Sequence, residues 1–164
     1  VAQNGKVMLF LDGNDPEDEQ RFTIAHEIAH FLLDYWFPRQ SLIRQLGQGA
    51  VDIIDGLREP TVSERLVAIL HDVDLGPYSS FMNRDAPEDG AAIWDAENRA
   101  DRVAMALLAP QEAVLAHLDL ATITYSARLE AAEETLRSYF RLPSQVCSAY
   151  ALSLIHISEP TRPY

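Results

Sequence analysis

The sequence predicts an α+β fold that is mostly helical, with a small β-sheet near its N-terminal end. Residues 6–11 form a short apolar run before Asp12-Gly13-Asn14, a pattern typical of a strand that ends in a turn. Apolar residues then recur with the helical period over residues 22–34 and again over residues 93–108. One strand signal followed by several helical segments, without internal repeats, favours the α+β class.

The composition excludes some functions. The formal net charge of −12 argues against direct nucleic-acid binding by this piece, because the 13 Lys and Arg residues do not obviously supply a basic face. No segment approaches the run of about 18 apolar residues that a membrane-spanning helix needs, so no membrane association is expected. The single cysteine, Cys147, excludes an internal disulfide framework and suits a reducing, cytoplasmic compartment.

The first predicted helix begins after Asp15-Pro16, where a capping residue, a proline and three acids are typical of a helix start. We expect it to stop before Pro38, because the residue that precedes a proline disfavours the helical conformation. This helix contains the pattern HExxH as His26, Glu27 and His30. At about 100° per residue the two histidines lie about 40° apart on one face, so both rings can reach a single zinc ion.

The rest of this helix agrees with a metal site. Its polar residues fall in one narrow stripe, formed by Thr23, His26, Glu27, His30 and Asp34. The other positions are apolar, so the helix is expected to be largely buried, with the stripe facing a cleft, a metal or buried partners. The alternative is a pair of core histidines whose ring nitrogens are satisfied by hydrogen bonds.

A second helix, predicted over residues 93–108, supplies a candidate for a third ligand. Glu97 and Asp101 lie within its apolar face, where Ala100 and Ala104 would let the helix approach its neighbour closely. The spacing suits Glu97 as a zinc ligand and Asp101 as the acceptor of a ring N–H from a ligating histidine. The alternative is a buried ion pair of these carboxylates with Arg65, Arg99 or Arg102.

Two stretches resemble a known family. RFTIAHEIAHFLL at residues 21–33 closely resembles the active-site helix of the ImmA/IrrE family of metallopeptidases, and ENRADRVAMALLAP at residues 97–110 resembles the family's second conserved phrase. The resemblance implies a zincin-like fold in which His26, His30 and Glu97 bind zinc, the gluzincin arrangement. It also implies that Glu27 is the catalytic base and that Asp101 supports a ligand.

The resemblance covers about residues 6–36 and 93–151, and residues around 136–144 look like the family's terminal helix pair. Residues 37–92 are then expected to be an insertion into a metallopeptidase-like domain of residues 1–151. The 66 residues between His30 and Glu97 (97 − 30 − 1) are more than the compact members of the family would need.

Within the expected insertion, residues 40–56 are predicted to be a loop with one short helix. Thr61-Val62-Ser63-Glu64 is a capping box that opens a helix through about His71. Four apolar residues of this helix have the spacing of a core face, namely Val62, Leu66, Ile69 and Leu70. Residues 72–90 form a turn-rich stretch that is interpreted as a solvated loop with buried aromatic anchors, with a lid or a partner surface as alternatives. Its apolar side chains include Tyr78, Phe81 and Met82.

Two more helices are predicted near the end, one from Pro110 to about Asp119 and one capped by Ser126 that runs through Phe140. The sequence LSLIHISEPTR at residues 152–162 resembles the translation of a transposase adapter used in short-read sequencing libraries. Residues 152–164 are therefore interpreted as an artefactual tail that does not pack against the domain, and His156 is not a ligand candidate. The chain is expected to be a fragment open at both ends.

Among the other titratable residues, His71 and His117 have no ligand-like neighbour at a useful spacing and are interpreted as structural. An oxyanion-stabilising hydroxyl could come from any of four tyrosines, Tyr35, Tyr78, Tyr125 and Tyr139, and the sequence does not choose among them.

The sequence therefore predicts a Zn²⁺-dependent endopeptidase, and the family resemblance implies that its protein substrate is a helix-turn-helix transcriptional repressor. Two other classes stay open. One is a zinc-bearing binding or sensor module that does not cleave its partner, because metal ligands without turnover would have the same pattern. The other is a helical interaction domain without a metal.

Overall fold

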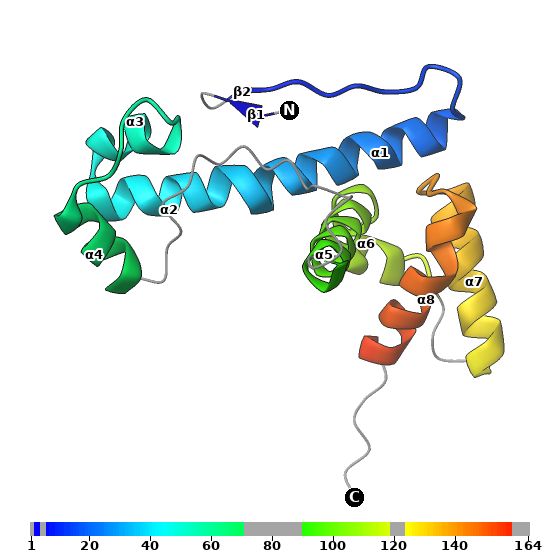
Figure 1. Cartoon of the computed structure of the whole chain (residues 1–164). Coiled ribbons are helices and arrows are strands. Elements are labelled where there is room, and N and C mark those ends of the chain that lie inside the picture. Colours follow the sequence, from blue (N-terminus) through cyan, green and yellow to red (C-terminus); the bar gives the residue numbers. More distant parts are fainter. Residues whose placement is uncertain (1, 4–5, 71–89, 119–123, 159–164) are drawn as a thin grey trace, which may run out of the picture. The chain divides into compact units, whose positions relative to one another are not determined.

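The computed structural model describes residues 2–3, 6–70, 90–118 and 124–158, and most of them are helical (Figure 1). The chain divides into two compact units. One consists of Val1–Phe10 with Glu27–Ala100, and the other of Leu11–His26 with Asp101–Tyr164. The mostly helical architecture predicted from the sequence is confirmed. None of the described helices is both long enough and apolar enough to cross a membrane.

The N-terminal sheet is smaller than predicted. Strands β1 (Ala2–Gln3) and β2 (Lys6–Val7) pair in antiparallel orientation, with Ala2 opposite Val7. The predicted strand at residues 6–11 therefore ends after its second residue, since β1 offers a partner to only two residues. The turn that follows is present, with the backbone N–H of Asn14 donating to Asp12 Oδ1 at 2.9 Å.

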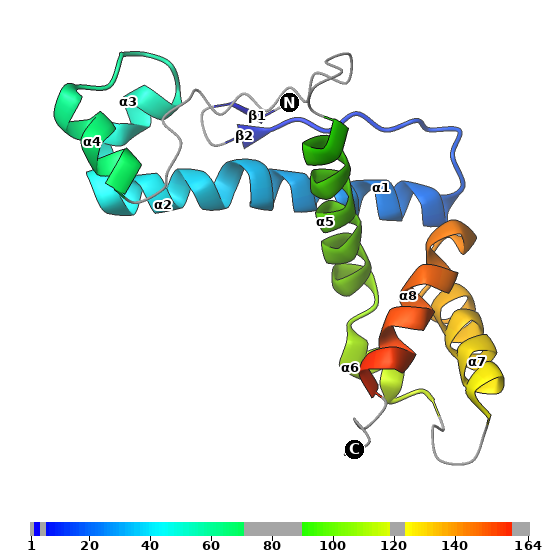
Figure 2. The ribbon, with the colours of Figure 1, turned by 60° about the horizontal axis from the view of Figure 1, so that its bottom comes forward.

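Helix α1 spans Glu17–His30 and carries three acids in its first turn, as predicted. The prediction that helical backbone ends before Pro38 is wrong. A π-helical turn, Phe31–Trp36, follows α1 directly and leads into helix α2, Phe37–Leu46, as one ribbon (Figure 2). Pro38 lies in the first turn of α2, where its missing N–H is not needed, so the helical backbone can continue past it.

Residues 40–56 contain more helix than predicted. After α2 the backbone turns at Gly47, which has a φ of +79°, into a 3₁₀ turn (Gln48–Ala50) and the short helix α3 (Val51–Ile54). Leu42, Ala50 and Ile54 are buried together as a small core of this unit. The apolar residues of this segment therefore pack together from helices and a 3₁₀ turn, where the sequence predicts mostly loop.

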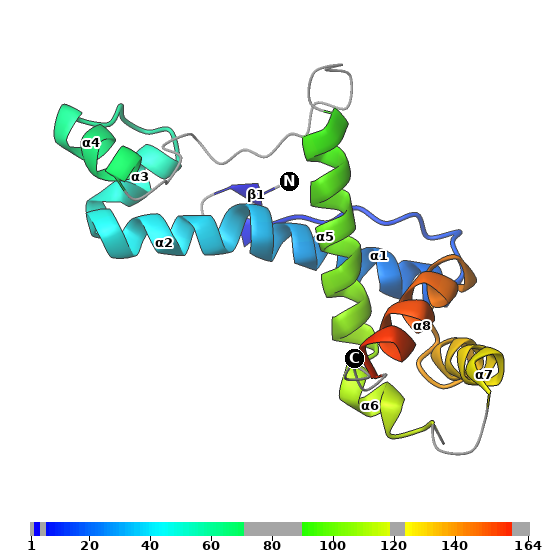
Figure 3. The same cartoon turned by 90° about the horizontal axis from the view of Figure 1, so that it is seen from below.

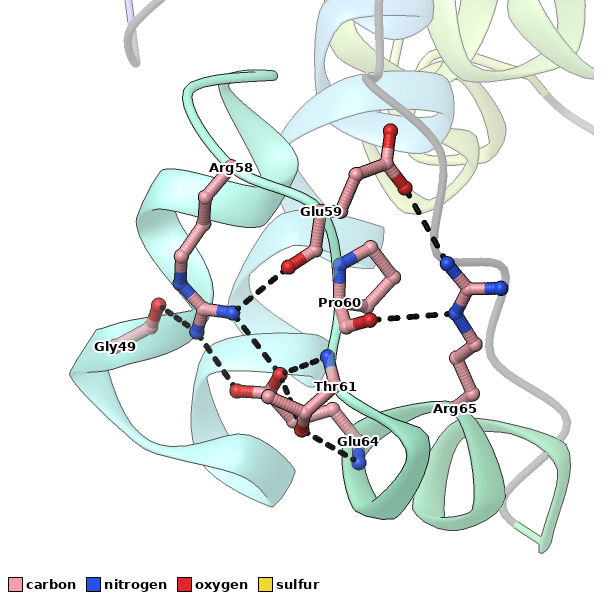
Figure 4. A network of polar contacts seen from close by, with 7 residues as sticks. All are labelled: Gly49, Arg58, Glu59, Pro60, Thr61, Glu64 and Arg65. Atoms are coloured by element: carbon pink, nitrogen blue, oxygen red, sulfur yellow. Dashed lines mark hydrogen bonds and ion pairs between the residues drawn. The ribbon is translucent and has the colours of Figure 1, made fainter.

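The predicted capping box is confirmed at the start of helix α4, Val62–Leu70 (Figure 4). The backbone N–H of Thr61 donates to Glu64 Oε2 at 2.7 Å, and the backbone N–H of Glu64 donates to Thr61 Oγ1 at 3.3 Å. Arg58 donates to both carboxylate oxygens of Glu64 and to the carbonyl of Gly49. The hydrogen bonds that Glu64 accepts from Arg58 and Thr61 lower its pKa to about 2. Those from Arg58 have the largest effect.

The prediction that Val62, Leu66, Ile69 and Leu70 face a core is wrong, because they are between 57% and 80% exposed. The residue of α4 that is buried is Ala68. Apolar spacing correctly places the four residues on the helix but cannot determine which face meets a neighbour. Helix α4 contacts α2, and Figure 3 shows α3 and α4 together at the end of α2. His71 and nearly all of the stretch 72–90, with Tyr78, Phe81 and Met82, lie outside the described residues.

The second unit contains helices α6 (Gln111–Leu115), α7 (Tyr125–Ser138) and α8 (Ser144–Ser158), the C-terminal part of α5 (Gly90–Leu108) and the part of α1 up to His26. Helices α7 and α8 lie side by side (Figures 1 and 2). Its core contains residues of these helices and of the segment between α7 and α8. They include Met105, Val114, Leu136, Leu142, Cys147 and Tyr150.

Two predicted helix boundaries in this unit need correction. Helix α7 is capped by Thr124, whose Oγ1 accepts from the backbone N–H of Ala127 at 3.4 Å, and Ser126 lies inside the helix. Helix α6 ends at Leu115, before the predicted end at Asp119. The cap differs by two residues and the end of α6 by four residues, so each difference is about one helical turn or less.

The prediction that residues after 151 do not pack is wrong for residues 152–158. They continue helix α8, and Leu154 and Ile155 are 1% and 0% exposed in the core of the second unit. These two residues follow Cys147 and Ala151 at helical spacing, so they extend the same buried stripe. The adapter origin of residues 152–164 and the domain boundary at residue 151 stay predictions.

Candidate functional site

The His30 ring is oriented by a carboxylate from the π-helical turn. Its Nδ1 lies 2.7 Å from Asp34 Oδ2, one helical turn further along the chain. Because an ionised carboxylate can only accept, Nδ1 carries the hydrogen and Nε2 is the nitrogen through which this ring would bind a metal. The other oxygen of Asp34 lies 3.5 Å from Arg99 Nη2.

Glu97 approaches the other side of the same ring. Its Oε2 lies 3.6 Å from His30 Nε2, although 66 residues separate the two in the chain. This separation is close to the distance of about 3.4 Å between two atoms that share one tetrahedral zinc ion. The pKa of His30 is raised, mainly by the hydrogen bond to Asp34, with smaller contributions from the charges of Asp34, Glu97 and Glu27, while burial opposes the shift.

His26 has the same kind of carboxylate partner within the second unit. Its Nδ1 lies 2.8 Å from Asp101 Oδ1, the contact expected if Asp101 accepts a ring N–H from a ligating histidine. The Phe22 ring packs near the imidazole, with a centroid distance of 6.4 Å. Both motif histidines are therefore oriented through Nδ1, so Nε2 is the metal-facing nitrogen in each.

His26 and His30 offer imidazole nitrogens as metal ligands, and Glu97 offers a carboxylate oxygen. Two imidazole nitrogens and one carboxylate oxygen form the donor set of catalytic zinc sites in which a fourth position stays open for water or substrate. The residues therefore fit zinc in their chemistry. Glu27, the predicted base, is half-buried beside them on α1 and adds its negative charge near His30.

The alternative role of Glu97 and Asp101, a buried ion pair with a nearby arginine, has less support. Arg65 pairs with Glu59, and Arg99 pairs with Asp34. Asp101 contacts a histidine at hydrogen-bond distance, and Glu97 contacts another.

The other candidate residues within the described chain are one histidine, His117, and three tyrosines, Tyr35, Tyr125 and Tyr139. His117 Nδ1 donates to the carbonyl of Ala113 at 2.7 Å, and its ring packs against Tyr139 at a centroid distance of 4.2 Å. Tyr35 is buried, with its hydroxyl accepting from Arg39, whereas Tyr125 and Tyr139 are exposed.

Sequence reasoning left Asp34 and Tyr150 without a role. Asp34 had a clear signal, because it lies on the polar stripe of the motif helix at i+4 from His30. Tyr150 donates from its hydroxyl to the carbonyl of Ala109 at 2.8 Å, and burial raises its pKa. That contact crosses 41 residues and has no local signal.

Residues 2–41 match the family model Peptidase_M78, described as the IrrE N-terminal-like domain. The match includes the whole HExxH motif and Asp34, and it ends well before Glu97. No curated protein and no solved structure shows a significant match. The match supports the ImmA/IrrE resemblance and suggests a metallopeptidase-type function.

Proposed function

We propose that this chain is a zinc-dependent endopeptidase of the gluzincin type with a zincin-like active site. The observation that carries the proposal is that each histidine of the HExxH motif has a carboxylate on Nδ1, Asp101 for His26 and Asp34 for His30. Carboxylates placed in this way fix the tautomer of metal-ligating histidines and raise their basicity. Two ordinary core histidines on one helix would not each need a carboxylate partner.

The roles follow from the chemistry of the side chains. His26, His30 and Glu97 would hold the zinc ion, which supplies a Lewis acid and lowers the pKa of water from about 15.7 towards about 7. Glu27 would take the proton of the attacking water and pass it to the leaving amine. Asp101 and Asp34 would keep the imidazole rings in the orientation that binding needs.

We expect close to one zinc ion per chain in the purified protein, and a loss of most of it in each of His26→Ala, His30→Ala and Glu97→Ala. Removing one of three protein ligands leaves too few for tight binding. Elemental analysis of the purified variants measures this. His117→Ala is the control, because its ring binds the Ala113 carbonyl, and it should keep the metal. Undiminished zinc in the Glu97→Ala protein would place the third ligand elsewhere.

The proposed substrate is a small helix-turn-helix repressor of the cytoplasm, encoded near this gene. The family resemblance suggests this class, and the net charge of −12 would favour encounter with a basic DNA-binding protein. We expect cleavage at one or two sites, in an exposed linker or helix end where the backbone can enter the active site.

The repressor is tested by incubating it with this protein and zinc or manganese, followed by mass spectrometry of the fragments. Discrete fragments that are missing with Glu27→Gln support the assignment. A repressor that stays intact under all conditions contradicts it, and cleavage of unrelated unfolded proteins instead would indicate a general peptidase.

A further inference from the structure

The π-helical turn Phe31–Trp36 links the site to the segment that follows it. Such turns are rare and occur frequently at functional sites. Two adjacent residues of this turn have different partners: Asp34 binds the His30 ring, and Tyr35 is buried at 3% exposure. Because the two share a peptide unit, contacts that fix Tyr35 also restrict where the Asp34 carboxylate can lie.

Tyr35 is held on several sides. Its ring stacks on Phe31 with a centroid distance of 5.5 Å, and the Arg39 guanidinium lies 5.8 Å from the ring centroid. Arg39 Nη1 also donates to the Tyr35 hydroxyl at 3.4 Å. These contacts restrict both the position of the ring and its rotation.

Arg39 is in turn fixed by Asp55, which follows helix α3. Arg39 donates from Nη1 to Asp55 Oδ1 and from Nη2 to Oδ2, the latter at 3.1 Å. Each of the two side chains is 8% exposed, so water competes little for these hydrogen bonds. A two-pronged pair of this kind sets the plane of the guanidinium as well as its position.

A buried ion pair is not by itself a sign of function. Replacing such a pair by apolar residues of similar volume is often neutral for stability or stabilising. The alternative for Arg39 and Asp55 is that they only hold their own segment together. The distinguishing feature is their connection to Tyr35, the residue next to the carboxylate that orients His30. Asp55 comes from the segment 37–92, to which the family resemblance gives no role.

We propose that Arg39 and Asp55 are positioning residues for the metal site, which act through Tyr35 to hold the π-helical turn that presents Asp34 to His30. The proposal rests on the proposed function, because it assigns the effect of this contact chain to zinc binding. It gives residues of the segment 37–92 a role in orienting a metal ligand. It also predicts that zinc affinity depends on residues that do not touch the metal.

The test replaces the pair by apolar residues of similar volume, Arg39→Met with Asp55→Leu, which removes both buried charges together. We expect the variant to fold and to bind zinc about 10-fold more weakly, measured as a Kd by competition with a chelator. Loss of a group that orients a ligand typically weakens metal binding by about 10- to 100-fold. Tyr35→Phe keeps the ring and removes only the hydroxyl, so it provides a milder second variant, with an expected loss of about 3-fold.

The matched control is Arg58→Met with Glu64→Leu. This pair belongs to the same segment and joins Gly49 to the start of α4, but its contacts do not include the π-helical turn (Figure 4). We expect its zinc Kd to equal that of the wild type. A control that loses zinc as strongly as the Arg39 and Asp55 variant would show that only the general stability of the segment matters, and would overturn the proposal.

A second measurement does not depend on the metal. The ¹⁵N spectrum of the histidine rings in zinc-free protein reports which nitrogen carries the hydrogen, and wild-type His30 should show it on Nδ1. The Arg39 and Asp55 variant should show a mixture of tautomers, whereas an unchanged tautomer together with an unchanged Kd would overturn the inference alone. Wild-type protein that binds no zinc would instead overturn the proposed function and this inference together.

Discussion

Replacing Glu27 by glutamine is expected to lower the rate of peptide cleavage by about 10²- to 10⁴-fold, the usual contribution of a general base. The amide has the shape of the carboxyl group but cannot accept the proton of the attacking water. Glu27 is not expected to be a ligand, so zinc should stay at the wild-type level. The rate is measured as kcat on a substrate cut by the wild type, and the metal by elemental analysis of the same sample.

Glu17→Gln is a suitable control for this variant, since it makes the same chemical change on the same helix. Glu17 is exposed in the first turn of α1, where it pairs with Arg141 at 2.7 Å. We expect its cleavage rate to match the wild type. Equal rates for Glu27→Gln and the wild type would contradict the mechanism, and loss of zinc from Glu27→Gln would mean that this residue supports the metal directly.

Replacing Leu154 or Ile155 by alanine is expected to lower the free energy of unfolding by about 2–5 kcal/mol each, the usual cost of truncating a fully buried aliphatic side chain. Both residues lie in the core of the second unit with Leu136, Leu142 and Cys147. Each truncation leaves a cavity that the surrounding helices fill only in part. Denaturant unfolding of the two variants measures the loss.

Leu152→Ala is the control in the same helix, because Leu152 is 46% exposed, and it should change the free energy of unfolding by less than about 0.5 kcal/mol. Stability that is equal to the wild type in Leu154→Ala and Ile155→Ala would favour the interpretation of residues 152–164 as a tail without a packing role. In that case the contacts of α8 beyond Ala151 would contribute nothing to folding.

The sequence by itself determined the features that depend on one or two helical turns. The placement of His26, Glu27 and His30 on one face of α1 follows from the 3.6-residue period. The capping box of Thr61 and Glu64 needs only a spacing of three residues. Each of these contacts joins residues of the same segment, so local geometry alone brings them together.

Tertiary structure decided which distant partners meet and which faces are buried. Asp101 could have served either histidine, and the fold pairs it with His26, 75 residues away. Arg39 and Asp55 form a buried ion pair that no local sequence pattern predicts. Helices α4 and α8 have comparable apolar spacing, but the four predicted core residues of α4 are exposed while Leu154 and Ile155 of α8 are buried. Spacing determines which residues share a face, whereas burial depends on the surface that another part of the chain presents to that face, so only the packed structure can determine it.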